Sequence, residues 1–128
     1  MILLDTCGLL ALQDGGLALS EEARGRLEAA GSEVFVSAIT AFEIGQKHGA
    51  GKLILNQAPS VWFPGMLHHH QLVELPVTSD ICTAATALPP LHKDPFDRII
   101  IATALKKHLT ILTTDKIIPA YPGVRVLW

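Results

Sequence analysis

The stretch Ile2-Leu3-Leu4-Asp5-Thr6 decides the fold. Three large apolar residues run directly into a carboxylate. A short, unbroken apolar run is typical of a strand buried on both faces, as in the middle of a parallel sheet. Asp5 then lies just past the carboxyl end of that strand, at the edge where open α/β sheets bind their ligands. A lone buried charge is costly, so Asp5 needs water, a partner or a metal.

The composition predicts one compact domain over residues 1–128. The chain is 49% apolar and 17% charged with a net charge of −2, which excludes a disordered chain and a broad basic surface for long nucleic acid. Cys7 and Cys82 fit neither a disulfide framework nor a zinc site, so we expect free thiols in a reducing cytoplasm. The first residues lack a basic leader, and no apolar run approaches the roughly 20 residues that span a bilayer. We therefore expect a cytoplasmic protein without a membrane segment.

Apolar strand patterns alternate with helical patterns along the whole chain. We expect helices over residues 6–13, 20–30, 37–48, 59–70, 78–88 and 94–108, and strands over residues 2–4, 33–37, 72–75, 110–114 and 124–127. Residues 52–55 are ambiguous, and Ser37 and Thr40 are alternative caps for the third helix. Alternation of this kind predicts an α/β fold, a three-layer α/β/α sandwich around a mostly parallel sheet of four to five strands.

Asp115 repeats the pattern of Asp5, because it also follows an apolar strand. Parallel strands bring both acids to the same edge of the sheet. The structural alternative for each is an aspartate in a loop turn. Two such acids at one edge favour a functional interpretation.

Asp97 and Glu43 each have a structural alternative as well. In Asp94-Pro95-Phe96-Asp97 the spacing fits a capping box, but Asp97 shares a helical face with Ile100, so we favour Asp94 as the cap and Asp97 as a ligand. Glu43 fits a capping box with Thr40 and also an i,i+4 pair with Lys47.

Carboxylates that converge at one edge repel one another unless a cation neutralises them. Oxygen ligands without cysteine or histidine suit Mg²⁺ or Mn²⁺ rather than zinc. Such ions activate water and bind phosphate oxygens, so the set Asp5, Glu43, Asp97 and Asp115 predicts phosphoryl chemistry.

The sequence resembles the PIN-domain ribonucleases, specifically VapC-type toxins of toxin–antitoxin pairs, over nearly its whole length. The resemblance rests on four motifs: Leu3-Leu4-Asp5-Thr6; Val36-Ser37-Ala38-Ile39 with Glu43-Ile44; His92-Lys93-Asp94-Pro95-Phe96-Asp97-Arg98 with Ile101-Ala102-Thr103-Ala104; and Thr113-Thr114-Asp115. It implies a PIN-like fold, cleavage of RNA phosphodiesters with Mg²⁺ or Mn²⁺, a cognate antitoxin and a homodimer.

By the same resemblance, Asp5, Glu43, Asp97 and Asp115 are the catalytic and metal-binding acids, supported by Thr6, Thr113, Thr114 and Asp94. Cys7 departs from the family pattern, and we expect it to be a buried, inert thiol. Lys47, Lys52, Lys93 and Arg98 flank the acids and are candidates for contacts with RNA phosphates.

Two further features have structural interpretations. Consecutive helical residues diverge by about 100°, so His68, His69 and His70 cannot converge on one ion, and we expect a solvated helix end. The stripe that contains Trp62, Phe63, Met66 and Leu67 fits either the core or a groove for a partner.

Two alternative functions come from other classes. One is a catalytically inactive PIN-like module that binds RNA or protein. The other is an aspartyl-phosphate enzyme that uses Asp5, but the chain lacks a second aspartate two residues later, at Cys7.

Overall fold

The computed structural model describes residues 1–128 and has five parallel strands in one sheet. The strands are β1 (Ile2–Leu4), β2 (Val34–Ser37), β3 (Val73–Leu75), β4 (Thr110–Leu112) and β5 (Val126–Leu127), in the order β3-β2-β1-β4-β5. Every pair is parallel, and Leu4 lies opposite Val36 on one side and Leu112 on the other. The apolar run at the N-terminus is therefore the central strand, as its unbroken burial predicts.

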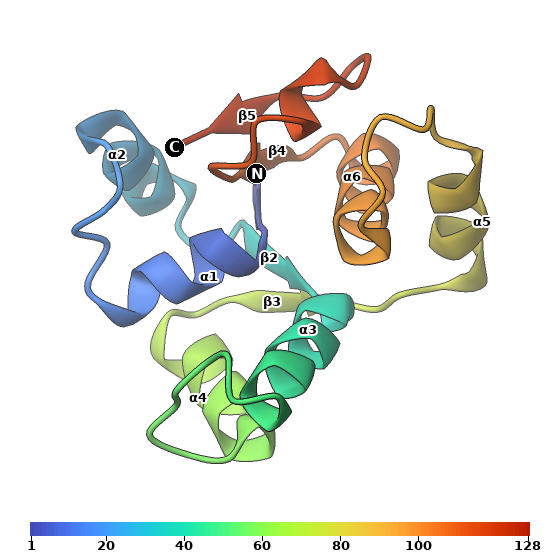
Figure 1. Cartoon of the computed structure of the whole chain (residues 1–128). Helices are drawn as coiled ribbons and strands as arrows, with labels where there is room; N and C mark the ends of the chain where they lie inside the picture. Colours follow the sequence, from blue (N-terminus) through green and yellow to red (C-terminus); the bar gives the residue numbers. More distant parts are fainter.

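Six α-helices connect or flank these strands. They are α1 (Thr6–Gln13), α2 (Glu21–Ala30), α3 (Ala38–Gly49), α4 (Pro59–His69), α5 (Ser79–Ala87) and α6 (Pro95–Lys107), and a short 3₁₀ turn, η1 (Ile118–Ala120), follows β4. Figure 1 shows α1 and α2 on one side of the sheet and α6 on the other, with α5 outside α6. The predicted α/β architecture is confirmed.

Alternating side chains of the strands feed two separate cores, as the two-residue period of a strand requires. Ile2 and Leu4 face a core shared with α1, α2, α3 and α4. Leu3 and Ile111 face a second core, where Ile100 and Ile101 of α6 cover the sheet. Both faces of β1 are thus buried. Packing on two sides therefore fixes the position of Asp5 and Thr6, the polar residues that follow the strand.

Several helix starts follow capping chemistry. Ser20 caps α2 and Thr78 caps α5, and Ser37 rather than Thr40 caps α3, accepting from the Ile39 N–H at 3.1 Å. Residues 52–55 form neither helix nor strand, and the strand predicted over residues 110–114 ends at Leu112. The last two residues of the predicted strand, Thr113 and Thr114, lie instead in the loop that leads to Asp115.

The apolar stripe of α4 lies in the core. Trp62, Phe63 and Met66 are buried and Leu67 packs against them, and the helix continues through Pro64. No helix of the structure is both long enough and apolar enough to cross a membrane.

Candidate functional site

Asp5 joins the central strand to the first helix. Its side chain caps α1, because Oδ1 accepts a hydrogen bond from the Gly8 N–H at 2.7 Å. A Cβ at Gly8 would lie 2.8 Å from the Leu112 carbonyl oxygen, so only glycine lets α1 begin this close to β4. Burial raises the pKa of Asp5, although hydrogen bonds from Thr113 and Gly8 oppose this. A buried acid is thus held rigidly at the carboxyl edge of the sheet.

Asp115 lies in the loop after β4, the strand adjacent to β1. Its Oδ1 accepts from the N–H groups of Ile117 at 2.7 Å and Ile118 at 3.2 Å. Its own N–H donates to the Thr113 hydroxyl at 3.0 Å. Burial raises the pKa of Asp115, but hydrogen bonds from His92 and from these backbone groups outweigh it, and the net pKa is lowered. These contacts therefore favour the ionised form of Asp115.

Glu43 approaches the same edge from α3. It is buried, and each of its oxygens has a partner: the Thr6 hydroxyl donates to Oε1 at 2.6 Å, and the Lys47 ammonium lies 3.0 Å from Oε2. Because Ser37 caps this helix, the capping-box interpretation of Thr40 and Glu43 is wrong. The interpretation as an i,i+4 pair with Lys47 is correct, and the pair lies against the acidic site.

Asp97 lies in the first turn of α6. Asp94 caps this helix by accepting from the Phe96 N–H at 2.9 Å. The N–H of Asp94 donates to the His92 ring rather than to Asp97, so no capping box forms. Burial raises the pKa of Asp97 to about 7, and the charges of Asp94, Glu43 and Asp115 add to this while His92 opposes it. The carboxyl of Asp97 is therefore held in an environment that disfavours its charged form.

The four acids form one electrostatic group. The charge of Glu43 raises the pKa of both Asp5 and Asp97, and so does the charge of Asp115. Charges on neighbouring carboxyl groups raise one another's pKa in this way. Asp97 and Asp115, together with His92, have ligand atoms within 4.8 Å of one another, and Asp5 and Glu43 lie outside that group. Carboxylate oxygens are the ligands that Mg²⁺ and Mn²⁺ prefer. A divalent cation would relieve the repulsion that raises the pKa of Asp97, so the residues present fit such an ion.

His92 is a member of this site to which sequence reasoning assigned no partner. Its Nε2 lies 2.8 Å from Oδ2 of Asp115 and 3.1 Å from Oδ2 of Asp97, and ligand atoms of the three residues lie within 4.8 Å of one another. Burial lowers the pKa of His92, but the hydrogen bond to Asp115 and the nearby acids raise it overall. Its position inside the motif 92–98 was the only available signal, because its contact with Asp115 spans 23 residues.

The remaining predicted site residues divide into three groups. Thr6 and Thr113 contact the acids directly, while Thr114 is exposed and opposes the rise in the pKa of the Cys7 thiol. Cys7 is exposed, so its expected burial is wrong; partial desolvation and the charge of Asp5 raise the pKa of its thiol. Lys52 and Lys93 are exposed, which leaves them free to meet a polyanion.

Arg98 has a structural role that differs from the expected one. Its NH2 nitrogen donates to the carbonyls of Ala85 at 2.8 Å and Leu88 at 2.9 Å, at the end of α5. Its NH1 nitrogen donates to the carbonyls of Pro89 and His92. Cationic side chains stabilise helix C-termini in this way. Because both terminal nitrogens are engaged, we withdraw Arg98 as a phosphate contact.

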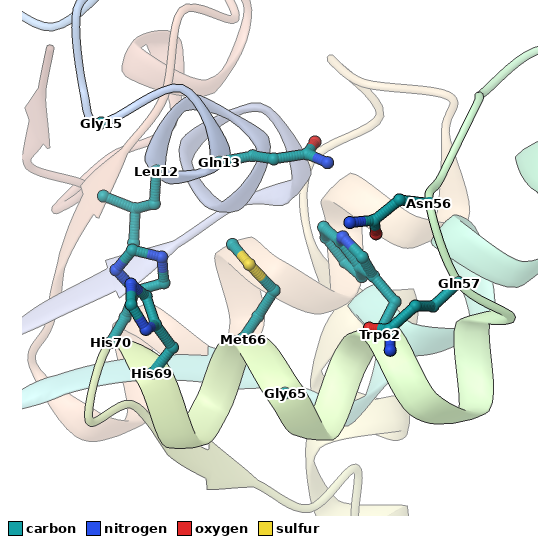
Figure 2. A pocket seen from close by; sticks show the side chains of 10 residues that line it. All are labelled: Leu12, Gln13, Gly15, Asn56, Gln57, Trp62, Gly65, Met66, His69 and His70. Carbon is teal, nitrogen blue, oxygen red and sulfur yellow. The ribbon is translucent and has the colours of Figure 1, made fainter.

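The largest cavity, about 420 Å³, lies away from the acids between the end of α1 and α4. Figure 2 shows Trp62 and Met66 on its floor and Gln13, Asn56 and Gln57 around it. His69 and His70 meet edge to face at its rim, with ring centroids 4.7 Å apart. No acid of the site lines this cavity, and His68, His69 and His70 form no metal-binding group.

Comparison with known proteins agrees with this fold. The family model described as "PIN domain" matches residues 2–124. No curated protein matches the sequence.

Several solved structures share the fold. A DNA-bound VapBC from Salmonella typhimurium has a TM-score of 0.72 and 20% identity, covering 98% of this chain and 95% of that one. A toxin–antitoxin complex from Klebsiella pneumoniae has a TM-score of 0.66 and 24% identity, covering 97% and 95%. FitAcB from Neisseria gonorrhoeae has a TM-score of 0.66 and 22% identity, covering 100% and 97%. The chain belongs to the PIN-domain family.

Proposed function

We propose that the protein is a metal-dependent endoribonuclease and the toxin of a toxin–antitoxin pair. The observation that supports this most strongly is the group of Asp5, Glu43, Asp97 and Asp115, in which burial raises the pKa of Asp97 to about 7 and the charges of Glu43 and Asp115 add to the rise. Membership of the PIN family supports nuclease chemistry, and structural neighbours that are toxin–antitoxin complexes support the toxin assignment.

In this proposal Asp5, Asp97 and Asp115, with Glu43, hold Mg²⁺ or Mn²⁺. Such an ion would supply a polarised water and would neutralise charge on the scissile phosphate. The chain itself supplies rigidity: Thr6 and Lys47 fix Glu43, and Thr113 bonds both Asp5 and the Asp115 backbone. Lys47, Lys52 and Lys93 are the proposed contacts with RNA phosphates.

The proposed partners are an RNA substrate, a cognate antitoxin and a second copy of the chain in a homodimer. We also propose a cytoplasmic location, where the proposed RNA substrate would be available. Since one sheet recruits strands from both ends of the chain, we propose that residues 1–128 act as a single domain.

An RNA cleavage assay tests the proposal. Purified protein is incubated with structured RNA in Mg²⁺, in Mn²⁺ and in EDTA, beside Asp5→Asn, Asp97→Asn and, as a control, Asp80→Asn, whose carboxylate is exposed on α5 and pairs with Lys106. We expect metal-dependent cleavage by the wild type and the control, and none by the two site variants. Cleavage that persists in EDTA would overturn the mechanism.

The alternative is a catalytically inactive PIN module that binds RNA or protein. It is favoured by one observation, the engagement of both Glu43 oxygens by Thr6 and Lys47. The cleavage assay combined with a gel-shift experiment separates the two functions, because an inactive RNA-binding module would shift the RNA without cleaving it in either metal.

A further inference from the structure

His92 lies between two acids that come from separate parts of the fold. Asp97 is in the first turn of α6, and Asp115 follows β4. The Nε2 atom of His92 is within hydrogen-bond distance of Oδ2 of both, at 3.1 Å and 2.8 Å. The side chain is 10% exposed, so it has little access to water as an alternative partner. Its one ring nitrogen thus serves two carboxylates.

The other ring nitrogen defines the tautomer. Nδ1 accepts a hydrogen bond from the Asp94 N–H at 3.2 Å. A neutral imidazole carries one proton, and a nitrogen that accepts a hydrogen bond does not carry it. The proton is therefore on Nε2, where it faces Asp97 and Asp115. In the metal-free protein a protonated Nε2 has no free lone pair, so this nitrogen donates to the two acids.

The backbone of His92 is held independently of its ring. Its N–H donates to the Tyr121 hydroxyl at 2.8 Å, and its carbonyl accepts from Arg98 at 3.1 Å. The Tyr121 hydroxyl in turn donates to the Pro89 carbonyl at 2.9 Å. Tyr121 and Arg98 thereby fix the loop before α6, which aims the imidazole at the two acids before any ligand arrives.

We propose that His92 is a positioning residue of the acidic site, which shares its Nε2–H between Oδ2 of Asp97 and Oδ2 of Asp115 and is not itself a metal ligand. It holds the two carboxylates side by side against their repulsion. Partners of this kind that orient metal ligands contribute substantially to metal affinity. The consequence for cleavage rests on the proposed nuclease function, whereas the donor role does not.

The first test observes the tautomer directly. Long-range ¹H–¹⁵N correlation spectra of the ¹⁵N-labelled, metal-free full chain are recorded at pH 8, and the His92 signals are identified by their loss in His92→Gln. We expect a fixed Nε2–H tautomer with Nδ1 unprotonated, unchanged when Mg²⁺ is added. An Nδ1–H tautomer, signals averaged between tautomers, or loss of the Nε2 proton on addition of Mg²⁺ would overturn the proposal.

The second test measures Mn²⁺ affinity by calorimetry below the unfolding temperature. His92→Leu removes the donor and should weaken binding by roughly 10- to 100-fold, whereas His92→Gln, whose amide N–H replaces Nε2–H, should retain most of the affinity. The control His68→Gln, at an exposed position on α4, should match the wild type. Unchanged affinity in His92→Leu, or equal losses in both His92 variants, would contradict the proposal.

These readouts separate the two proposals. A wild type that binds Mn²⁺ through the acids but does not cleave RNA refutes the nuclease function and leaves the role of His92 to be judged from the spectra and affinities. If His92→Leu does not fold, the tautomer in the wild-type spectra and the Mn²⁺ affinity of His92→Gln still test the role of His92.

Discussion

Replacing Asp97 by asparagine should stabilise the metal-free protein at pH 8. The pKa of Asp97 rises from 3.8 to about 7 on folding, chiefly through burial. The unfolded chain therefore releases this proton first as the pH rises, and the free energy of unfolding falls between about pH 4 and pH 7. A rise of about three pKa units corresponds to a loss of at most about 4 kcal/mol in the free energy of unfolding.

Several effects reduce this limit. The carboxyl is 20% exposed and loses its contact with His92, and removal of an acid from the first turn of a helix costs about 0.3–1 kcal/mol. With solvent screening included, we expect a net gain of about 1–2 kcal/mol at pH 8 and a rise in Tm of roughly 4–8 °C. At pH 4 the wild-type carboxyl is already protonated, so the gain should disappear.

Thermal and urea unfolding in EDTA, followed by tryptophan fluorescence at pH 8 and pH 4, measures this effect. Glu22→Gln is the matched control, since Glu22 is an exposed acid in the first turn of α2 and should lose stability slightly at pH 8. Added Mg²⁺ should stabilise the wild type more than Asp97→Asn, because ligands stabilise the state that binds them. A loss of stability in Asp97→Asn at pH 8 would refute the reasoning and make Asp97 a structural residue of the helix.

Three further substitutions test the supporting structure, each by urea unfolding. Arg98→Met should cost about 2–4 kcal/mol, because it leaves the carbonyls at the end of α5 without their donor; a loss below about 0.5 kcal/mol would contradict this role. Thr40→Val should be neutral or stabilise by up to about 1 kcal/mol, because the buried Thr40 hydroxyl oxygen has no partner; a clear loss would reveal a missed hydrogen bond. Gly8→Ala should cost about 1–3 kcal/mol, because its Cβ would meet the Leu112 carbonyl oxygen at 2.8 Å, and unchanged stability would mean that α1 shifts freely.

Local sequence signals predicted the elements well where chemistry marks their ends. Asp94 and Pro95 fix the start of α6, and Ser20 fixes the start of α2. The unbroken apolar run Ile2–Leu4 predicted a central strand, since only a strand covered on both faces needs no polar residue. The 3₁₀ turn Ile118–Ala120 was not predicted, because it depends on Asp115 accepting two backbone N–H groups.

The sequence predicted those site residues whose position follows directly from the strand or helix that carries them. Asp5 and Asp115 follow adjacent parallel strands, so topology alone brings them to one edge. His92 and Arg98 could not be placed in this way. Their partners are set by the path of the loop over residues 88–94, which Tyr121 fixes from a distant part of the chain. Lateral contacts of this kind leave no periodic pattern in the sequence.

Anomalous diffraction from crystals of the full chain grown with Mn²⁺ would test the central claim most directly. The account predicts a Mn²⁺ peak within coordinating distance of Asp5, Asp97 and Asp115, with Glu43 beside it and His92 outside the ligand set. A peak at another place, or a metal held by His92 while Asp5 or Asp97 points away, would contradict it.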